Sequence, residues 1–241
     1  MTGHSGIVCG TPERPIPRGL RKARRFLARP HLPRRLDRLL RSRFPLIHRA
    51  LKYRTLDPTS KKYWDGVWTD EGRDTWRTYP NLFRKVSGCV PPGSRVLDIG
   101  CGPGILLDLL RKHRQCTGVG LDLSTVAARL VDELAISAVV AKLPEVPFKD
   151  YSFDVAIGTE VLEHLHDPAA ALREMKRVTK SRGLVICSVP NACMGPDDCD
   201  EHLHEFDLPT FVRLIDDLGH AEIANVEDMG GPRLLATITT T

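Results

Sequence analysis

Three glycines alternate with other residues directly after an apolar run that ends in an acid, in RVLDIGCGPG at residues 95–104. The apolar, β-branched run predicts a buried strand, and the glycines predict a tight turn into a helix. A backbone without side chains lets a ligand approach closely, and we expect the amides of Gly100, Gly102 and Gly104 to face that ligand at a helix N-terminus. The segment therefore predicts a cofactor-binding turn, with Asp98 at the end of its strand.

The spacing of the glycines and two acids indicate the class of cofactor. A dinucleotide site requires GxGxxG, whereas this turn reads GxGxG and places Asp98 where a pyrophosphate would lie. Asp98 suits an amine-bearing or cationic group instead, and Asp122 ends the next predicted strand, where an acid accepts both hydroxyls of a ribose. S-adenosylmethionine, a nucleoside with a positively charged tail, satisfies both acids. A nicotinamide oxidoreductase fits the same spacing poorly.

A second group of polar side chains follows the strand predicted at residues 153–160. In TEVLEHLHD, Glu160, Glu163 and His164 are three and four positions apart, so a helical turn would direct them to one side. Two carboxylates and an imidazole suggest a divalent ion, with Mg²⁺ as the expected metal, and DEHLHEFDLP adds His202 as a further ligand. Alternatively, His164 or His202 acts as a general base. In the structural alternative, Glu160 caps a helix and His164 bonds a carbonyl, while catalysis proceeds by proximity.

Strands and helices alternate from residue 95 onward, which predicts an α/β domain at residues 95–241 with a mostly parallel sheet and helices on both faces. The last two strands have the pattern of a hairpin, so the last strand should run antiparallel. The expected strands are residues 95–100, 117–124, 137–143, 153–160, 183–190, 220–228 and 233–241, and the expected helices are residues 104–114, 125–135, 167–180 and 208–219.

The segments before residue 95 differ from the domain in composition. Residues 1–19 are rich in glycine and proline and are predicted to be disordered. Residues 20–54 carry leucines at helical spacing among arginines, interrupted by prolines, which predicts a basic amphipathic helical segment. Residues 55–94 contain all three tryptophans and predict a helical lid or cap, or an ordinary packing layer.

The charge of the chain is unevenly distributed. Residues 1–54 hold fifteen lysines and arginines against two acids, a net charge of +13. The whole chain has a net charge of +5, so the remaining residues together carry −8. A basic amphipathic segment of this kind binds an anionic membrane surface or another polyanion, packs as a helical cap on the domain, or serves as a targeting peptide.

The motifs together resemble those of the class I S-adenosylmethionine-dependent methyltransferases. VLDIGCGPG resembles the first motif of that family, GVGLDLS the second, PFKDYSFDVAIGTEVLEHLHDP the third and fourth, and GLVICSVPN the fifth strand. The resemblance covers roughly residues 75–241 and is strongest to the branch that contains ubiquinone-biosynthesis O-methyltransferases. It implies a Rossmann-like fold with a seven-stranded sheet, here with an N-terminal helical extension.

The resemblance also implies roles for individual residues. The glycine turn holds the methionine part of the cofactor while Asp98 orients it, Asp122 holds the ribose, and Leu123 packs on the adenine. Lys142 departs from the family pattern, because many members carry there an acid that bonds the adenine amine, and lysine cannot accept that bond. The backbone around Leu143 would then replace it. The cofactor-binding set is expected to be Asp98, Gly100, Cys101, Gly102, Gly104, Asp122, Leu123, Leu143 and Thr159.

The function expected from these features is methyl transfer from S-adenosylmethionine to a small-molecule acceptor, at oxygen. One alternative is an RNA 2′-O-methyltransferase with a divalent metal, because ExxEH followed by His202 resembles the metal site of the small-RNA 3′-terminal enzymes. Nucleic acid is the less expected partner, since the acidic domain would repel phosphates. A second alternative is a scaffold that kept the fold and lost the chemistry, which only Lys142 supports.

The cysteines and the hydropathy bear on the compartment. The chain has seven cysteines and no CxxC pair, which predicts reduced thiols. It contains no run of roughly eighteen apolar residues and no apolar signal region at its start. We therefore expect a cytoplasmic location, either free or peripheral to a membrane.

Overall fold

The computed structural model describes residues 57, 59–73, 80–194, 201–219, 221–229 and 232–241, all of them in the second of two units of the chain. The predictions for residues 1–19 and 20–54, and the prediction for Trp76, lie outside the described residues. The strands of the second unit are β1 (Arg95–Ile99), β2 (Thr117–Asp122), β3 (Ser137–Val140), β4 (Phe153–Thr159), β5 (Thr179–Pro190), β6 (Ala221–Asp228) and β7 (Arg233–Thr240).

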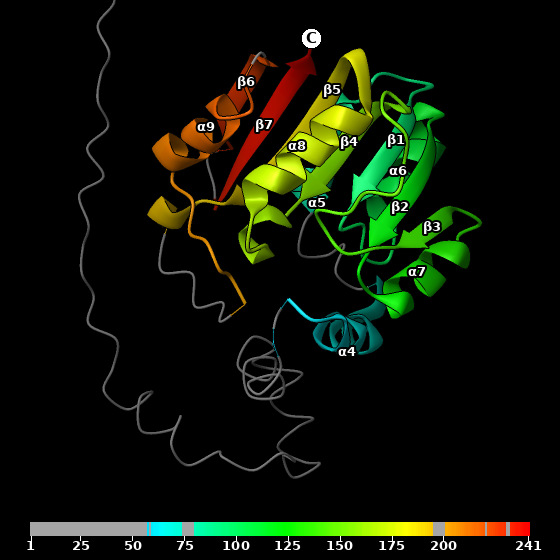
Figure 1. Ribbon diagram of the computed structural model, residues 1–241. Helices are drawn as coiled ribbons and strands as arrows, with labels where there is room; N and C mark the ends of the chain where they lie inside the picture. Colours follow the sequence, from blue (N-terminus) through cyan, green and yellow to red (C-terminus); the bar gives the residue numbers. More distant parts are fainter. Residues whose placement is uncertain (1–56, 58, 74–79, 195–200, 220, 230–231) are drawn as a thin grey trace, which may run out of the picture. The chain divides into compact units, whose positions relative to one another are not determined.

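These strands form one seven-stranded sheet in the order β3-β2-β1-β4-β5-β7-β6 (Figure 1). Neighbours from β3 to β5 pair in parallel, while β7 pairs antiparallel with both β5 and β6. The expected Rossmann-like sheet with an antiparallel last strand is therefore confirmed. The strand order reverses between β1 and β4, and ligands of such sheets bind beyond the carboxyl ends of the strands at this switch point.

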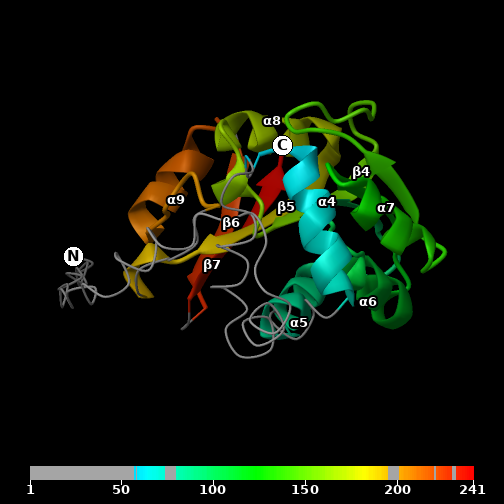
Figure 2. The ribbon, with the colours of Figure 1, turned by 90° about the horizontal axis from the view of Figure 1, so that it is seen from below.

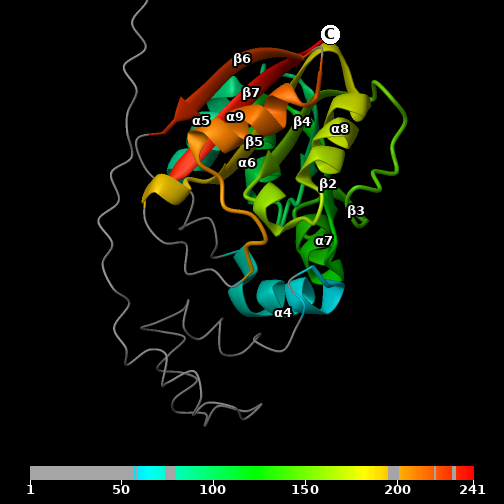
Figure 3. The same ribbon diagram turned by 60° about the vertical axis from the view of Figure 1, so that its left-hand side comes forward.

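Helices cover both faces of the sheet (Figure 3). Two buried clusters define the layers, one joining the sheet to α5, α6 and α7 and the other joining it to α8 and α9. The described helices are α4 (Lys61–Glu71), α5 (Pro80–Cys89), α6 (Ile105–Arg114), α7 (Thr125–Asp132), α8 (Pro168–Val178) and α9 (Leu208–Asp216), with short 3₁₀ turns η2 (Leu162–His164) and η3 (Ala192–Met194).

Strand β1 shows why the sequence folds into these layers. Val96 packs into the cluster on the α6 side, whereas Leu97 and Ile99 pack into the cluster on the α8 side. A strand that is buried on both faces has a continuous apolar run rather than an alternating one. Asp98 is the one polar residue in this run, and it is only 2 % exposed.

Several element ends differ from those expected by one to four residues, and two of the larger differences have a local cause. Helix α7 ends at Asp132 rather than 135, because the chain turns there and Ala135 takes a left-handed conformation with φ 57°. Strand β5 begins at Thr179 rather than 183, because Thr179 pairs with Phe153 across a register shift that continues the ladder.

Helix α4 lies at the carboxyl-end edge of the sheet beside α7, whereas α5 packs on the face of the sheet (Figure 2). The segment expected to form a helical lid or cap therefore contributes two helices, which lie in two different positions. None of the helices in the described part of the chain has the length and apolar character of a membrane span.

Candidate active site

The glycine turn between β1 and α6 adopts a backbone that side chains rarely permit. Gly100, Gly102 and Gly104 have φ values of 67°, 50° and 78°, in the left-handed region. A Cβ added at Gly100 would lie 2.8 Å from Val161, and a Cβ added at Gly102 would lie 2.8 Å from the ring of Trp68. Close approach of two neighbouring segments therefore requires glycine here, in addition to the turn itself.

The backbone amides of the turn point into the protein, and the expectation that they face a ligand is wrong. Gly100 and Cys101 donate to a carbonyl of β2, at 2.7 and 3.2 Å. Gly102 donates to Asp122 Oδ2 at 2.9 Å, and Gly104 donates within the turn at 3.0 Å. These bonds fix the turn onto β2. Helix α6, by contrast, receives no side-chain cap from Gly104, so its first turn presents the positive end of a helix at this edge.

Asp98 lies beneath the turn as a buried acid. Its Oδ1 atom has no hydrogen-bond partner among the described residues. Burial, and then the nearby charge of Asp122, raise the pKa of Asp98 to about 8. A buried acid without a partner is costly in free energy, and a cationic ligand group removes that cost. The α-ammonium group of S-adenosylmethionine fits this atom.

Asp122 ends β2 and holds the turn. It accepts from the amide of Gly102 through Oδ2 and from the amide of Ser124 through Oδ1, at 2.9 and 2.8 Å. Burial raises its pKa to about 6, against the lowering effect of these amides. Each carboxylate oxygen retains a further lone pair, so Asp122 can still accept from ribose hydroxyls. Its ribose role stays a prediction.

The remaining expected cofactor residues lie at the same edge. Leu123 follows β2, Leu143 follows β3, and Thr159 ends β4, each of them partly exposed. The side chain of Cys101 differs, because its Sγ packs against Gly120 inside the fold. Cys101 can therefore contribute to a cofactor site only through its backbone. Lys142 is exposed.

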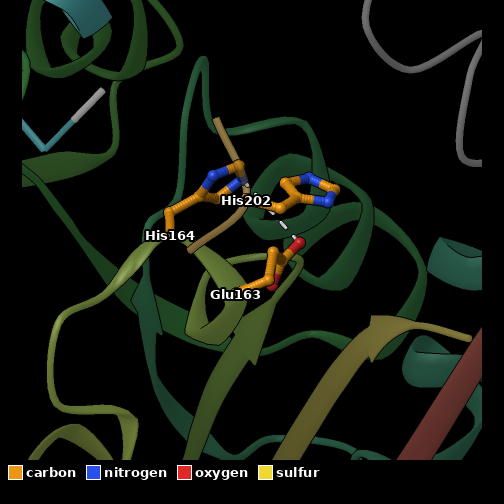
Figure 4. A group of neighbouring side chains, drawn as sticks. All are labelled: Glu163, His164 and His202. Carbon is orange, nitrogen blue, oxygen red and sulfur yellow. Dashed lines mark ion pairs between the residues drawn. The ribbon is translucent and has the colours of Figure 1, made fainter. Parts of the chain in front are cut away.

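Beyond β4, the structure brings Glu163, His164 and His202 together (Figure 4). One ligand atom from each residue lies within 4.8 Å of the other two. Nε2 of His164 is 3.8 Å from Glu163 Oε1, and the rings of His164 and His202 meet edge to face with centroids 4.8 Å apart. The carbonyl of Glu163 accepts hydrogen bonds from the amides of Leu203 and His204. These bonds attach the segment that carries His202 to η2.

Glu160 does not join this group, contrary to the expected helical face. Residues 162–164 form a short 3₁₀ turn, and Glu160 precedes it in a left-handed conformation with φ 53°. Its carboxylate accepts from Ser188 Oγ at 2.8 Å and from Arg233 Nε at 2.9 Å. Burial raises the pKa of Glu160, while Arg233 and Ser188 lower it. Two imidazoles and one carboxylate remain, a donor set less suited to Mg²⁺ than all-oxygen sites.

Sequence reasoning missed how α4 completes the site. The hydroxyl of Tyr63 donates to the carboxylate of Glu201, and both side chains are buried. The ring of Trp64 meets the ring of His164 with centroids 5.0 Å apart. Asp65 accepts from Ser124 Oγ at 2.7 Å, at the start of α7. Only the density of aromatic residues in this segment signalled such contacts.

The geometry thus combines a glycine turn above a buried acid with a group of two imidazoles and one carboxylate at the carboxyl ends of the strands. A family model described as "Methyltransferase domain" matches residues 35–223. The chain belongs to this family, within the class of S-adenosylmethionine-dependent enzymes of this fold.

Named relatives agree with this class. A "Probable S-adenosylmethionine-dependent methyltransferase" of Mycobacterium tuberculosis is 33% identical over 145 residues, 58% of this chain and 53% of the relative. A "Ubiquinone biosynthesis O-methyltransferase" of Paracidovorax citrulli is 30% identical over 142 residues, 54% of this chain and 57% of the relative. The chain thus spans about half the length of these curated relatives.

A solved structure has the same fold. It is that of a SAM-dependent methyltransferase from Aquifex aeolicus, which superposes with a TM-score of 0.58 at 19% identity, over 78% of this chain and 100% of that one. At this identity the similarity shows the fold alone.

Replacing Asp98 with asparagine tests the ammonium assignment. We expect Asp98→Asn to weaken binding of S-adenosylhomocysteine roughly 10- to 100-fold, the contribution of a charged hydrogen bond. The raised pKa of Asp98, about 8, means that the acid is largely protonated at pH 7 in the unliganded protein. Binding should then release a proton, and affinity should rise from pH 6.5 to 8. Calorimetry in two buffers of different ionisation enthalpy measures both effects.

The same variant has a built-in folding control. A folded-state pKa above the unfolded value means that the ionised acid destabilises the unliganded protein as pH rises. Asp98→Asn should therefore raise the thermal midpoint at pH 8 while it weakens binding. A wild-type affinity that does not change with pH would refute the assignment.

Replacing Gly102 with alanine tests the close approach of α4. We expect Gly102→Ala to weaken S-adenosylhomocysteine binding at least about tenfold, because φ 50° is strained for alanine and its Cβ displaces Trp68. Gly88→Ala on α5 is the matched control, since no atom lies within 4 Å of its added Cβ. Equal affinity for the two variants in calorimetry would show that the turn tolerates a side chain.

Proposed function

We propose that this chain transfers the methyl group of S-adenosylmethionine to an oxygen atom of a small hydroxyl-bearing acceptor. The observation that carries the proposal is the buried carboxyl group of Asp98 beneath a glycine turn, whose Oδ1 has no partner in the described part of the chain, with Asp122 at the neighbouring strand end. The bound cofactor supplies a methyl group that is already activated on a sulfonium. The protein must then hold the acceptor in line and receive its proton.

An oxygen acceptor is supported by the side chains beyond β4. Glu163, His164 and His202 form a polar group next to the switch point, where proton transfer from a hydroxyl is needed. The relative from Paracidovorax citrulli is named an O-methyltransferase of ubiquinone biosynthesis. A phenolic hydroxyl suits this group, because loss of its proton makes the oxygen a better nucleophile.

Of the two histidines, we assign His202 as the general base. His164 is held between two groups of the protein, with Nδ1 3.0 Å from the carbonyl oxygen of Glu201 and Nε2 3.8 Å from Glu163 Oε1. A ring fixed through both nitrogens positions its neighbours. His202 packs edge to face on that ring and is the more exposed of the two side chains, which suits it to meet an acceptor.

Magnesium is not part of this mechanism. Glu160 is engaged by Ser188 and Arg233, and the group that remains is rich in imidazole nitrogen, which favours softer metals over Mg²⁺. The RNA 2′-O-methyltransferase alternative loses support for the same reason, since it relied on Glu160 as a ligand. The intact cofactor features disfavour the scaffold alternative.

The basic segment 20–54 lies outside the described residues, so its role rests on the sequence. We propose that it brings the enzyme to an anionic membrane surface, given the net charge of +13 over residues 1–54. Co-sedimentation with phosphatidylserine vesicles, but not with phosphatidylcholine vesicles, and its loss on deletion of residues 1–54 would support this role.

The proposed function is tested by calorimetry and methyl transfer. S-adenosylhomocysteine should bind with micromolar affinity, and labelled S-adenosylmethionine should methylate members of a panel of catechols and hydroquinones. Activity should persist in a chelator. Transfer to RNA alone, or activity that only added Mg²⁺ restores, would overturn the assignment.

Replacing His202 with glutamine tests its role. We expect His202→Gln to lower kcat roughly 100-fold, the usual contribution of a general base, while the affinity for S-adenosylhomocysteine stays unchanged. His113→Gln is the control, because His113 is exposed at the end of α6, away from the acceptor. A kcat for His202→Gln equal to that of the control would remove His202 from the mechanism.

A further inference from the structure

We propose that Trp68 on α4 binds the amino-acid end of the cofactor, with its indole N–H donating to the α-carboxylate while Asp98 takes the α-ammonium. This inference rests on the proposed function, because it requires S-adenosylmethionine as the ligand. It adds a side chain from outside the α/β domain to the cofactor site.

The starting observation is a pair of buried polar atoms of opposite character. Asp98 Oδ1 and Trp68 Nε1 are both buried and have no hydrogen-bond partner among the described residues. When Asp98 is ionised, its Oδ1 acts only as an acceptor. The indole N–H of Trp68 acts only as a donor. Buried polar atoms in native proteins are nearly always satisfied, so each requires a partner that comes from a ligand or water.

Both residues adjoin the glycine turn, Asp98 from β1 and Trp68 from α4. Asp98 lies two residues before Gly100, and the Trp68 ring lies against Gly102, where an added Cβ would be 2.8 Å from Cζ2 and Cη2. The ring atoms nearest to this position, Cη2, Cζ2 and Cζ3, belong to the six-membered part of the indole, and Cζ2 is separated from Nε1 by a single atom. A zwitterion bound beside the turn, between Asp98 and Trp68, presents an ammonium and a carboxylate, which match the acid and the N–H.

The carboxylate needs a donor that the turn does not supply. The amides of Gly100, Cys101, Gly102 and Gly104 all donate to protein acceptors, and residue 103 is a proline. The positive end of α6 attracts a carboxylate, but its attraction is not specific for a position. Among the side chains that contact the turn, Trp68 provides a directional donor whose hydrogen is not already used.

Helix α4 is fixed firmly enough to place this ring. Near its start, Asp65 accepts from Ser124 Oγ at 2.7 Å and from the amide of Val126 at 3.3 Å. Burial raises the pKa of Asp65, but its bonds with Lys61 and Ser124 outweigh that effect and lower it to about 2. After its end, Arg73 donates to the carbonyl of Leu130 and pairs with Glu133 at 3.0 Å. Trp68 lies between these two anchors on α7.

The test compares ligands that differ only in the amino-acid end. S-adenosylhomocysteine carries both charged groups, its decarboxylated analogue keeps only the amine, and 5′-methylthioadenosine has neither. We expect Trp68→Phe to weaken S-adenosylhomocysteine roughly 10- to 100-fold and to leave the affinity for 5′-methylthioadenosine within twofold. The decarboxylated analogue should bind both proteins equally well.

Tyr151→Phe is the control, since Tyr151 is exposed and precedes the start of β4, at the edge of the sheet opposite the glycine turn. It should leave the affinity for S-adenosylhomocysteine unchanged, and thermal unfolding should show that both variants fold. If the Trp68→Phe protein binds S-adenosylhomocysteine as tightly as wild type or more tightly, this inference is overturned and the proposed function is not. Wild-type protein that does not bind S-adenosylhomocysteine would overturn the proposed function and this inference together.

Discussion

The burial of one carboxylate at the end of β1 is the constraint on which the site depends. Asp98 occupies a position in an apolar run whose neighbours all pack into the core, and it is 2 % exposed without a partner for Oδ1. Its cost is tolerated because the strands on both sides and the helices on both faces hold β1 rigidly. A carboxyl group whose ionised form is unfavourable in the empty protein is stabilised in that form when a cation binds, so the preference for a cationic ligand comes from a buried acid.

The glycine turn itself is fixed in shape, and its amide hydrogens are already used within the protein. Its amides bond to β2 and to Asp122, which fixes the loop shape before any ligand binds. Such preorganisation avoids an ordering cost on binding. Recognition of a ligand then depends on the groups around the glycine turn. These are the two acids, the first turn of α6 and helix α4.

Local patterns predicted the sheet, the glycine turn and the two acids, because each depends on the order of a strand, a turn and a helix along the chain. Ser124 as the cap of α7 was predictable for the same reason, and its Oγ does accept from Val126 and Ala127. The helical face of Glu160, Glu163 and His164 was wrong, because spacing gives a common direction only within a helix. Here the chain leaves β4 through a left-handed residue and a 3₁₀ turn.

The contacts of α4 could not be predicted, because they depend on where a separate helix lies against the sheet. This helix touches the cofactor side through Trp68, and it touches the acceptor side through Tyr63 and Trp64. The rings of Trp64 and Trp68 stack with centroids 6.1 Å apart, so a movement of one ring changes the packing of the other. A ligand group that contacts Trp68 therefore meets the same anchored helix that contacts His164 through Trp64. One helix therefore borders both the glycine turn and the group of Glu163, His164 and His202.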